Sequence, residues 1–269
     1  YDTRNTKSFL VDLNNGESKV IDDRNSQDVY SDPGHFNTVK NHYGRTVIDM
    51  KGGKAYLIGA GFTKDGQHPF IDEMDVKSLK KKRWYTSNLK NAKEAIVDIL
   101  NPSKGEILTT QQSPSEYPNY FKKSIKSNKV QAVTHFVNPF ESMKDVYKEV
   151  ITYKRNDGVT LTGTLYLPAH YDRKAKTEKL PLLIWAYPRE YKDANTAGQS
   201  TQNPNDFTFP YYGSFVYWVT KGYAVLDNAA FPIIGEGKTE PNDTFLTQLV
   251  ANADAAIKAC LLYTSPSPR

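Results

Sequence analysis

The sequence predicts a chain of two parts, an all-β first half over residues 1–140 and an α/β sheet over residues 141–259. The first half contains short alternating apolar runs separated by Asn, Asp and Gly turns, which is typical of antiparallel strand pairs. From Asp145 onward the apolar runs become continuous and alternate with helical periodicity, which is typical of a sheet covered by helices. With 269 residues, the chain can hold one large domain or two smaller ones.

The composition excludes several classes of protein. Hydrophobic residues make up 38% and aromatic residues 12% of the chain, which is enough to build a packed core. The longest apolar runs, such as residues 180–186, are far shorter than the roughly 20 residues that span a bilayer, so we expect no membrane span. The net charge of +5 is small and dispersed, and we therefore expect no nucleic-acid partner.

The first half predicts a series of strands joined by tight turns. Asn14-Asn15-Gly16 separates the first two runs, and an Asn-Gly step between alternating runs is a strong hairpin signal. Later turns are expected at residues 64–66, 101–105 and 126–129. The predicted strands are residues 8–13, 19–22, 54–59, 69–76, 82–87, 95–100, 106–111, 120–125 and 131–136.

These strand pairs recur with a loose period. Asp12-Leu13, Asp75-Val76 and Ser124-Ile125 each end a strand and lead into a turn and a second strand. The recurrence favours four-stranded units repeated side by side, as in a β-propeller, because each small sheet buries its faces only against its neighbours. About two to three such blades fit in residues 1–140, whereas a closed ring needs more, so we expect the chain to begin inside the propeller.

The second half opens with an antiparallel hairpin and continues with buried strands. Residues 146–155 and 160–167 are predicted to pair around the turn Asn156-Asp157-Gly158. Two continuous apolar runs, residues 180–186 and 223–227, indicate strands that are covered on both faces. We expect the strand at residues 223–227 to lack a neighbour on one side, which would leave an exposed sheet edge.

Two helices are predicted between and after these strands. Residues 215–221 indicate a helix that is closed by Gly222. Residues 242–259 carry apolar side chains at helical spacing, and Asp243 is suited to the N-terminal turn. A hairpin followed by strand, helix, strand and helix is the opening order of an α/β-hydrolase sheet.

At this point the sequence resembles a known family. Residues 150–259 are similar to the prolyl oligopeptidase family of serine peptidases, and within it to the glutamyl-endopeptidase-like branch. The motifs follow one another in order and cover nearly all of the second half, and the propeller-like first half is consistent with the same family. The resemblance is carried by residues 153–159, 164–168, 184–191, 197–199, 231–237 and 240–243.

The resemblance implies a serine-type endopeptidase or oligopeptidase, which cleaves peptide bonds through an acyl-enzyme with a Ser-His-Asp triad. The serine of such enzymes stands on a Gly-x-Ser-x-Gly elbow, and this sequence contains none. Ser200 lacks the second glycine and is interpreted as a loop serine, and His170 comes too early in the chain to be the triad base. We expect the elbow to follow the helix at 242–259, so the parent protein is an enzyme and this chain is inactive.

Three residues are candidates for a surviving part of the site. By resemblance, Tyr187 at the end of the strand 180–186 donates its hydroxyl to the oxyanion, whereas its alternative role is packing at a strand end. Arg189 and Glu190, in the loop expected to follow, are candidates for binding charged substrate groups, with a surface ion pair as the alternative. Gly235-Glu236-Gly237 is interpreted as a structural turn rather than a phosphate loop.

No cofactor or metal site is expected, because the histidines have no metal-like spacing. The expected partners are peptide substrates. The oligomeric state is left open by the sequence.

The last ten residues, 260–269, resemble the translation of a transposon-end sequencing adapter in every codon. We expect them to be a library scar rather than a native Ser/Pro-rich terminus, and the domain analysis therefore ends at Ala259. Cys260 is the single cysteine, so the remaining residues form no disulfide. Absence of cysteine leaves the compartment undecided, and a periplasmic or extracellular location is implied by the family resemblance alone.

Two alternative functions remain open at this stage. The parent could be an esterase or another acyl hydrolase, because one fold supports several chemistries. The chain could instead be a propeller-based binding module with a vestigial appendage, which requires a natural stop near residue 259.

Overall fold

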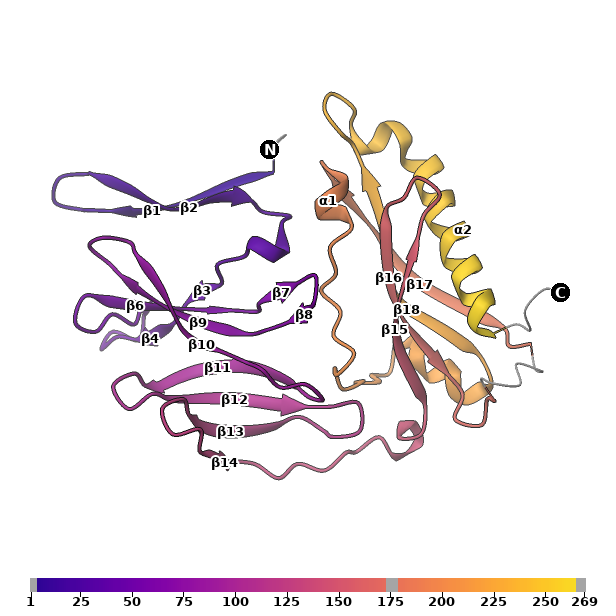
Figure 1. Ribbon diagram of the computed structural model, residues 1–269, viewed down its shortest axis with the longest axis horizontal. Coiled ribbons are helices and arrows are strands. Elements are labelled where there is room, and N and C mark those ends of the chain that lie inside the picture. The colour runs from indigo at the N-terminus through magenta and orange to yellow at the C-terminus, as the bar shows by residue number, and fades with distance from the viewer. Residues whose placement is uncertain (1–3, 173–178, 265–269) are drawn as a thin grey trace. The chain divides into compact units, whose positions relative to one another are not determined.

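The computed structural model describes residues 4–172 and 179–264 (Figure 1). The chain divides into two compact units. The first unit runs to Val137 and also includes Asn205–Phe207, whereas the second contains Asn138–Pro204 and the chain from Thr208 onward. Within the described ranges, no helix is long and apolar enough to cross a membrane.

The first unit consists of small antiparallel sheets. Two of them have four strands, in the orders β10-β9-β6-β3 and β11-β12-β13-β14, and the pairs β1-β2, β4-β5 and β7-β8 form two-stranded sheets. The elements are β1 (Asn5–Val11), β2 (Ser18–Asn25), η1 (Val29–Ser31), β3 (His35–Phe36), β4 (Thr38–Lys40), β5 (Thr46–Ile48), β6 (Lys54–Gly59), β7 (Phe62–Thr63), β8 (Gly66–Gln67), β9 (Phe70–Asp75), β10 (Lys81–Thr86), β11 (Lys93–Asn101), β12 (Glu106–Gln112), β13 (Asn119–Ser124) and β14 (Val130–Ala132).

The hairpins predicted for this unit are confirmed at β1-β2, β9-β10, β11-β12 and β13-β14. The short strands β3, β4, β5, β7 and β8 escape the sequence pattern, because two or three residues carry too little alternation to be recognised. β14 ends at Ala132 rather than at residue 136. The Val133 N–H still donates to the Tyr120 carbonyl oxygen of β13 at 2.8 Å, but the Phe136 N–H donates to the Asn119 side chain, to Oδ1 at 2.6 Å.

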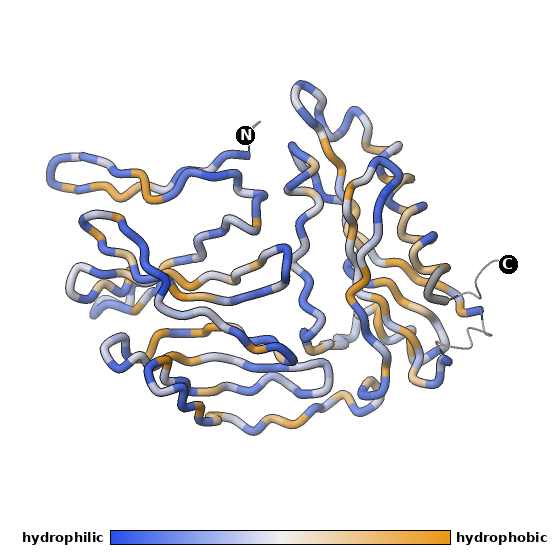
Figure 2. The backbone as a smooth tube through the Cα atoms, in the orientation of Figure 1, coloured by the Kyte–Doolittle hydropathy of each residue, from blue (hydrophilic) through white to orange (hydrophobic). Residues whose placement is uncertain are grey.

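Apolar side chains cover both faces of the β10-β9-β6-β3 sheet. On one face, residues of β6 and β9 pack against Ile99 of β11 and Ile107 of β12. On the other face, residues of the same two strands pack against Ile21 of β2. Successive sheets therefore stack face to face in chain order, as repeated strand pairs require. The turns between the strands are hydrophilic (Figure 2).

A buried charged cluster joins the two four-stranded sheets. Glu94 of β11 is 2% exposed, and its carboxylate accepts a hydrogen bond from the Tyr85 hydroxyl of β10 at 2.5 Å. Lys123 of β13 donates to the same hydroxyl at 2.5 Å and lies 3.3 Å from the Glu94 carboxylate. Burial and the neighbouring Glu94 charge raise the pKa of the Tyr85 phenol, so the hydroxyl stays protonated and donates.

The second unit is built on one mixed sheet in the order β15-β16-β18-β17. The pairs β15-β16 and β16-β18 are antiparallel, whereas β17 and β18 are parallel. Two helical elements lie on opposite faces of this sheet: η3 packs around Val225, and α2 packs around its neighbour Leu226 (Figure 1). The elements are η2 (Glu141–Met143), β15 (Tyr147–Lys154), β16 (Thr160–Leu167), β17 (Leu182–Tyr191), α1 (Ala194–Ala197), η3 (Phe215–Lys221), β18 (Ala224–Ile234), η4 (Pro241–Thr244) and α2 (Phe245–Thr264).

The strand order corrects the expectation about the sheet edge. β18 contains the run that was expected at an edge, but it lies between β16 and β17. The edge of the described sheet is β17, and it is not covered on both faces, because Trp185 and Tyr187 are exposed on it. Apolar runs report burial of side chains but not the order in which strands pair, so the sequence alone could not settle this point.

The two predicted helices are formed, but the second ends at Thr264 rather than at the predicted Ala259. η3 covers the expected residues and ends at Gly222 with a φ of +86°, but it is a 3-10 helix, consistent with the modest helix propensity of its aromatic and β-branched residues. η4 precedes α2 and is capped by the reciprocal side-chain bonds of Glu240 and Asp243. α2 continues to Thr264, and Cys260 is fully buried against the sheet.

Candidate functional site

Tyr187 lies in the exposed row of side chains on edge strand β17. Its side chain is 74% exposed, and strand alternation places Trp185 and Arg189 on the same face. The Trp185 ring stacks on Phe215 of η3, with ring centroids 4.4 Å apart. This stacking fixes one end of the row and leaves the Tyr187 phenol open to a ligand.

Arg189 and Glu190 lie in the strand and not in a loop, which corrects the expectation from the sequence. Both residues belong to β17, where they pair with Pro232 and Ile233 of β18. The predicted strand stops at residue 186, where the continuous apolar run ends. An edge strand tolerates proline, and β17 therefore continues to Tyr191.

The strand placement gives Arg189 a defined relation to Tyr187. The two residues are two positions apart on one face of β17. Arg189 is exposed and has no ion-pair partner among the residues that the structure describes. Its guanidinium is therefore available for a carboxylate beside the Tyr187 phenol. Strand alternation directs Glu190 to the other face, so the structure does not bring all three candidates together.

A β-bulge interrupts β18 next to this row. Pairing with β17 is regular up to Ile184, which lies opposite Leu226, and resumes with Ala186 opposite Ala229. The extra residue is accommodated at Asp227 and Asn228. Asn228 has a φ of +50°, in the left-handed region that residues other than glycine seldom adopt.

The bulge is held by a polar contact from the loop between α1 and η3. Gln202 Nε2 donates to the Asn228 carbonyl oxygen at 3.0 Å, and Gln202 Oε1 accepts from Thr164 Oγ1 of β16 at 2.7 Å. Asn228 Nδ2 donates to Asp227 Oδ2 at 3.2 Å. Burial raises the pKa of the Asp227 carboxyl above its usual value. The Asp-Asn step inside an apolar strand was the sequence signal for these residues, because Asn tolerates the left-handed conformation.

A buried arginine supports the far end of the paired strands. Arg155 is 3% exposed, and its Nη1 donates to the Pro232 carbonyl oxygen at 3.1 Å and to Asn252 Oδ1 at 2.9 Å. Asn252 Nδ2 also donates to the Pro232 carbonyl oxygen at 2.9 Å. Asp157 binds the remaining guanidinium nitrogens, and this contact holds the pKa of the Asp157 carboxyl below its usual value. β18 is therefore fixed where it faces Arg189.

The turn after β18 requires glycine at its first position. A Cβ on Gly235 would lie 2.5 Å from the Pro241 nitrogen, which no side chain can accommodate without moving the backbone. Gly237 has a φ of +60°. Glu236 between them accepts a hydrogen bond from the Ala194 N–H at 3.0 Å. These contacts agree with the structural interpretation of this turn.

Ser200 lies in the loop between α1 and η3, as expected. Its hydroxyl accepts from the Thr162 hydroxyl at 3.4 Å and from the Gln202 N–H at 3.2 Å. No helix begins at this serine, so the strand-to-helix geometry of a nucleophile elbow is not formed there. His170 lies in the turn after β16, next to residues outside the described ranges.

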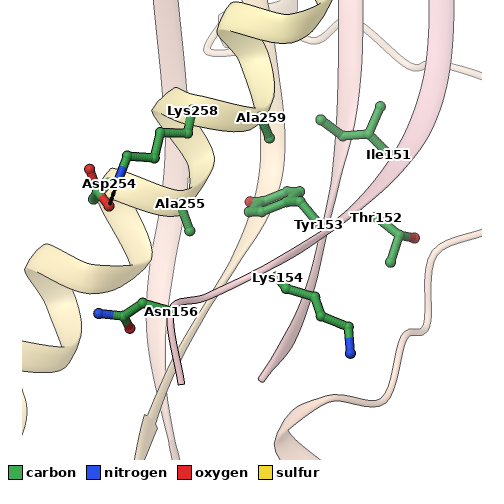
Figure 3. A pocket seen from close by; sticks show the side chains of 9 residues that line it. All are labelled: Ile151, Thr152, Tyr153, Lys154, Asn156, Asp254, Ala255, Lys258 and Ala259. Carbon is green, nitrogen blue, oxygen red and sulfur yellow. Dashed lines mark hydrogen bonds and ion pairs between the residues drawn. The ribbon is translucent and has the colours of Figure 1, made fainter. Parts of the chain in front are cut away.

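A hollow of about 390 Å³ lies on the other side of the sheet, between β15 and α2 (Figure 3). Ile151 and Tyr153 of β15 face Ala255 and Ala259 of α2 across it. The Tyr153 hydroxyl is buried and has no hydrogen-bond partner within the described ranges. Because α2 and η3 cover opposite faces, this hollow does not belong to the site around Tyr187.

The described fold resembles that of solved peptidases. Oligopeptidase B from Leishmania major matches 98% of this chain with a TM-score of 0.51 and 9% identity, and the match covers 41% of that structure. Dipeptidyl peptidase 4 from Porphyromonas gingivalis matches 97% with a TM-score of 0.51 and 14% identity, and the match covers 40% of that structure. The described fold is therefore similar to part of the fold of each of these two structures.

Sequence comparison finds two relatives of one description. The chain is 36% identical over 274 residues to the probable chloroplastic glutamyl endopeptidase of Arabidopsis thaliana, covering 96% of this chain. It is 35% identical over 271 residues to the protein of the same description from Oryza sativa subsp. japonica, covering 95% of this chain. The chain spans less than a third of these relatives, 28% and 29% of their lengths. No family model matches the chain. The predicted resemblance to the glutamyl-endopeptidase-like branch of the prolyl oligopeptidase family is confirmed.

Proposed function

We propose that this chain is part of a serine endopeptidase that cleaves peptide bonds next to acidic residues. The proposal rests on the similarity to glutamyl endopeptidases and on the position of Tyr187 on β17. In this proposal the four-stranded sheets of the first unit are propeller blades. The second unit is then the N-terminal part of an α/β-hydrolase domain, with the domain limits at residues 1–140 and 141–259.

The position of Tyr187 supports the proposal because β17 is the edge strand of the described sheet. η3 lies on one face of the sheet between β17 and β18, and α2 follows β18 on the opposite face. Crossovers between parallel strands are right-handed. A helix on the opposite face of the sheet therefore leads to a next strand that is placed in the opposite direction across the sheet. A strand that follows α2 in this sheet would therefore pair with the free edge of β17. Its carboxyl end would lie beside Tyr187, where open α/β sheets bind their ligands.

The proposed mechanism uses Tyr187 as an electrostatic stabiliser. A serine on the strand after α2 attacks the scissile carbonyl, and a histidine takes its proton. The carbonyl π electrons move to the oxygen, and the Tyr187 hydroxyl donates a hydrogen bond to the oxyanion. Collapse of this intermediate expels the amine, which receives the proton from histidine, and water then hydrolyses the acyl-enzyme. Residues 1–269 contain no Gly-x-Ser-x-Gly, so the chain alone is proposed to be inactive.

Arg189 is the proposed determinant of acidic specificity. It shares the exposed face of β17 with Tyr187, and a guanidinium binds a carboxylate with two parallel hydrogen bonds. Glu190 lies on the face of β17 opposite Tyr187, so any substrate contact that it makes is proposed to be separate from the contacts of Tyr187 and Arg189.

The first experiment is to sequence the source DNA through codons 259 and 260. A frame that continues from Ala259 into a strand and Gly-x-Ser-x-Gly supports the peptidase and identifies residues 260–269 as a scar. A genomic stop after Arg269 overturns it and favours the binding module.

The longer enzyme is then assayed on matched peptides with Glu, Gln or Lys before the scissile bond. Tyr187→Phe is expected to lower kcat about 100-fold or more with little change in KM, and Arg189→Gln to raise KM for the Glu peptide alone. Tyr211→Phe, at another exposed tyrosine of this unit, is the control and is expected to change neither. Hydrolysis of esters without cleavage of any peptide would instead identify an acyl hydrolase.

A further inference from the structure

The bulge at Asp227 and Asn228 decides which side chains of β18 lie beside Tyr187. Before the bulge, Leu226 faces the core under α2, and after it Phe231 faces the same core. A continuous strand would turn Phe231 to the opposite face, because a shift of one residue exchanges the two faces of a strand. With the bulge, the residue paired with Tyr187 is Ala230.

The bulge places Phe231 in the core and a small residue opposite Tyr187. Phe231 is 9% exposed in the core, so the bulge prevents a large apolar ring from lying on the face that carries Tyr187. Ala230 has a single methyl group, and the Tyr187 side chain beside it stays 74% exposed. The exposed Tyr187 ring is therefore not held by side-chain packing, and the register of β18 decides which residue lies opposite it.

The bulge is costly in two ways and is nevertheless clamped in place. Asn228 holds a left-handed conformation, and the neighbouring Asp227 carboxyl has no ion pair among the described residues. Gln202 bridges the Asn228 carbonyl oxygen and Thr164, so a loop and the adjacent strand both hold it. Strained backbone persists where the surrounding structure determines it, and bulges are frequent next to active sites, where they direct a side chain.

We propose that Asn228 is a positioning residue for Tyr187. Its left-handed backbone creates the register change that aims the Tyr187 hydroxyl at the developing oxyanion, and Gln202 locks that backbone. This inference rests on the proposed function, because it gives Asn228 a role only through the hydroxyl of Tyr187.

The test compares Asn228→Gly with Asn228→Val in the longer enzyme. Glycine adopts a positive φ freely, whereas a β-branched residue resists it. We expect Asn228→Val to lower kcat about 10-fold to 100-fold with KM changed less than about twofold, and Asn228→Gly to retain kcat. The matched control is Asn128→Val, which places the same strain at a φ of +55° in the turn between β13 and β14 and is expected to leave kcat unchanged.

A double-mutant cycle separates positioning from general damage. In a Tyr187→Phe background, Asn228→Val is expected to cause no further loss of kcat, because the hydroxyl that it positions is absent. An equal loss in both backgrounds would overturn the inference and leave the proposed function standing. An unchanged kcat in Tyr187→Phe itself would instead overturn the proposed function.

Folding is monitored by the melting temperature of each variant. Should Asn228→Val not fold, Gln202→Ala loosens the same backbone without adding strain. It is expected to lower kcat by a smaller factor in the Tyr187 background only, and an additive loss would again overturn the inference.

Discussion

Two carboxylates, Glu94 buried in the first unit and Asp227 partly buried in the second, have very different surroundings. Glu94 of the first unit accepts hydrogen bonds from the Tyr85 hydroxyl, from the Lys123 ammonium and, at 3.4 Å, from the Gln111 amide. Asp227 of the second unit accepts an amide hydrogen bond from Asn228 and has no ion pair within the described ranges. The positive charge of Lys148 only partly offsets the effect of burial on the pKa of Asp227, which stays above its usual value. Stability accounts for the first arrangement, since all of its charges are compensated. It does not account for the second, and this difference directs attention to the bulge beside Tyr187.

The largest expected effect breaks the compensated cluster. Lys123→Met leaves the Glu94 carboxylate buried without its cation, and this is expected to lower the free energy of unfolding by about 3–5 kcal/mol. Urea unfolding of the variant measures the loss. The control is the double variant Glu94→Leu with Lys123→Met, which removes both charges and is expected to recover most of the stability. A loss below about 1 kcal/mol in the single variant would show that the cluster contributes little.

The next effect concerns the buried arginine of the second unit. Arg155→Met leaves Asn252 Oδ1 without the guanidinium and removes one donor from the Pro232 carbonyl oxygen, at an expected cost of about 2–3 kcal/mol. Asp157→Asn is the matched control, because Asp157 is half exposed and its loss costs about 1 kcal/mol or less. Equal losses in the two variants would mean that the turn contact, rather than the buried hydrogen bonds, supports β18.

The elements around the candidate site differ in how well the sequence predicts them. Strands β16 and β6 have their predicted bounds, because their ends coincide with turn residues that the chain cannot place inside a strand. The strand predicted at residues 180–186 ends too early, because the apolar run stops there whereas β17 continues through Pro188 to Tyr191. A proline inside a strand is tolerated only at a sheet edge, and strand order is a tertiary property.

The same limit applies to individual site residues. Tyr187, Arg189 and Glu190 were identified as candidates from the motif alone, but which of them share a face depends on the strand that contains them. Asn228 was not identified at all. The Asp227-Asn228 step tolerates a left-handed residue, but the bulge follows from the pairing of β17 with β18, and no local pattern contains that pairing.

Replacing Asp227 is expected to increase stability, whereas breaking the Glu94 cluster is expected to lower it. Asp227→Asn removes a charge that burial opposes, so it is expected to stabilise the protein at pH 7 by about 1 kcal/mol. Because the pKa of Asp227 is raised in the folded state, the penalty is absent in acid. It grows as the pH rises from the ordinary Asp range through the raised pKa. Unfolding free energies of both proteins should therefore coincide near pH 3 and diverge toward neutrality. Equal unfolding free energies of the two proteins at both pH values would show that burial does not destabilise the Asp227 charge.

The smallest expected change in stability comes from removing a buried tyrosine hydroxyl that has no hydrogen-bond partner. The Tyr153 hydroxyl, in the hollow between β15 and α2, is buried without a partner within the described ranges (Figure 3). Tyr153→Phe removes a desolvated group that gains nothing in return, so it is expected to change stability by less than about 0.5 kcal/mol or to increase it.

Tyr85→Phe is its matched counterpart, because that hydroxyl bonds both Glu94 and Lys123. It is expected to cost about 1–3 kcal/mol in the same urea measurement, since removing the hydroxyl leaves two buried charged groups each short of a hydrogen bond. A comparable loss in Tyr153→Phe would mean that the Tyr153 hydroxyl is bonded in solution, by water or by a ligand in the hollow. The distinction between compensated and uncompensated polar groups would then rest on Asp227 alone.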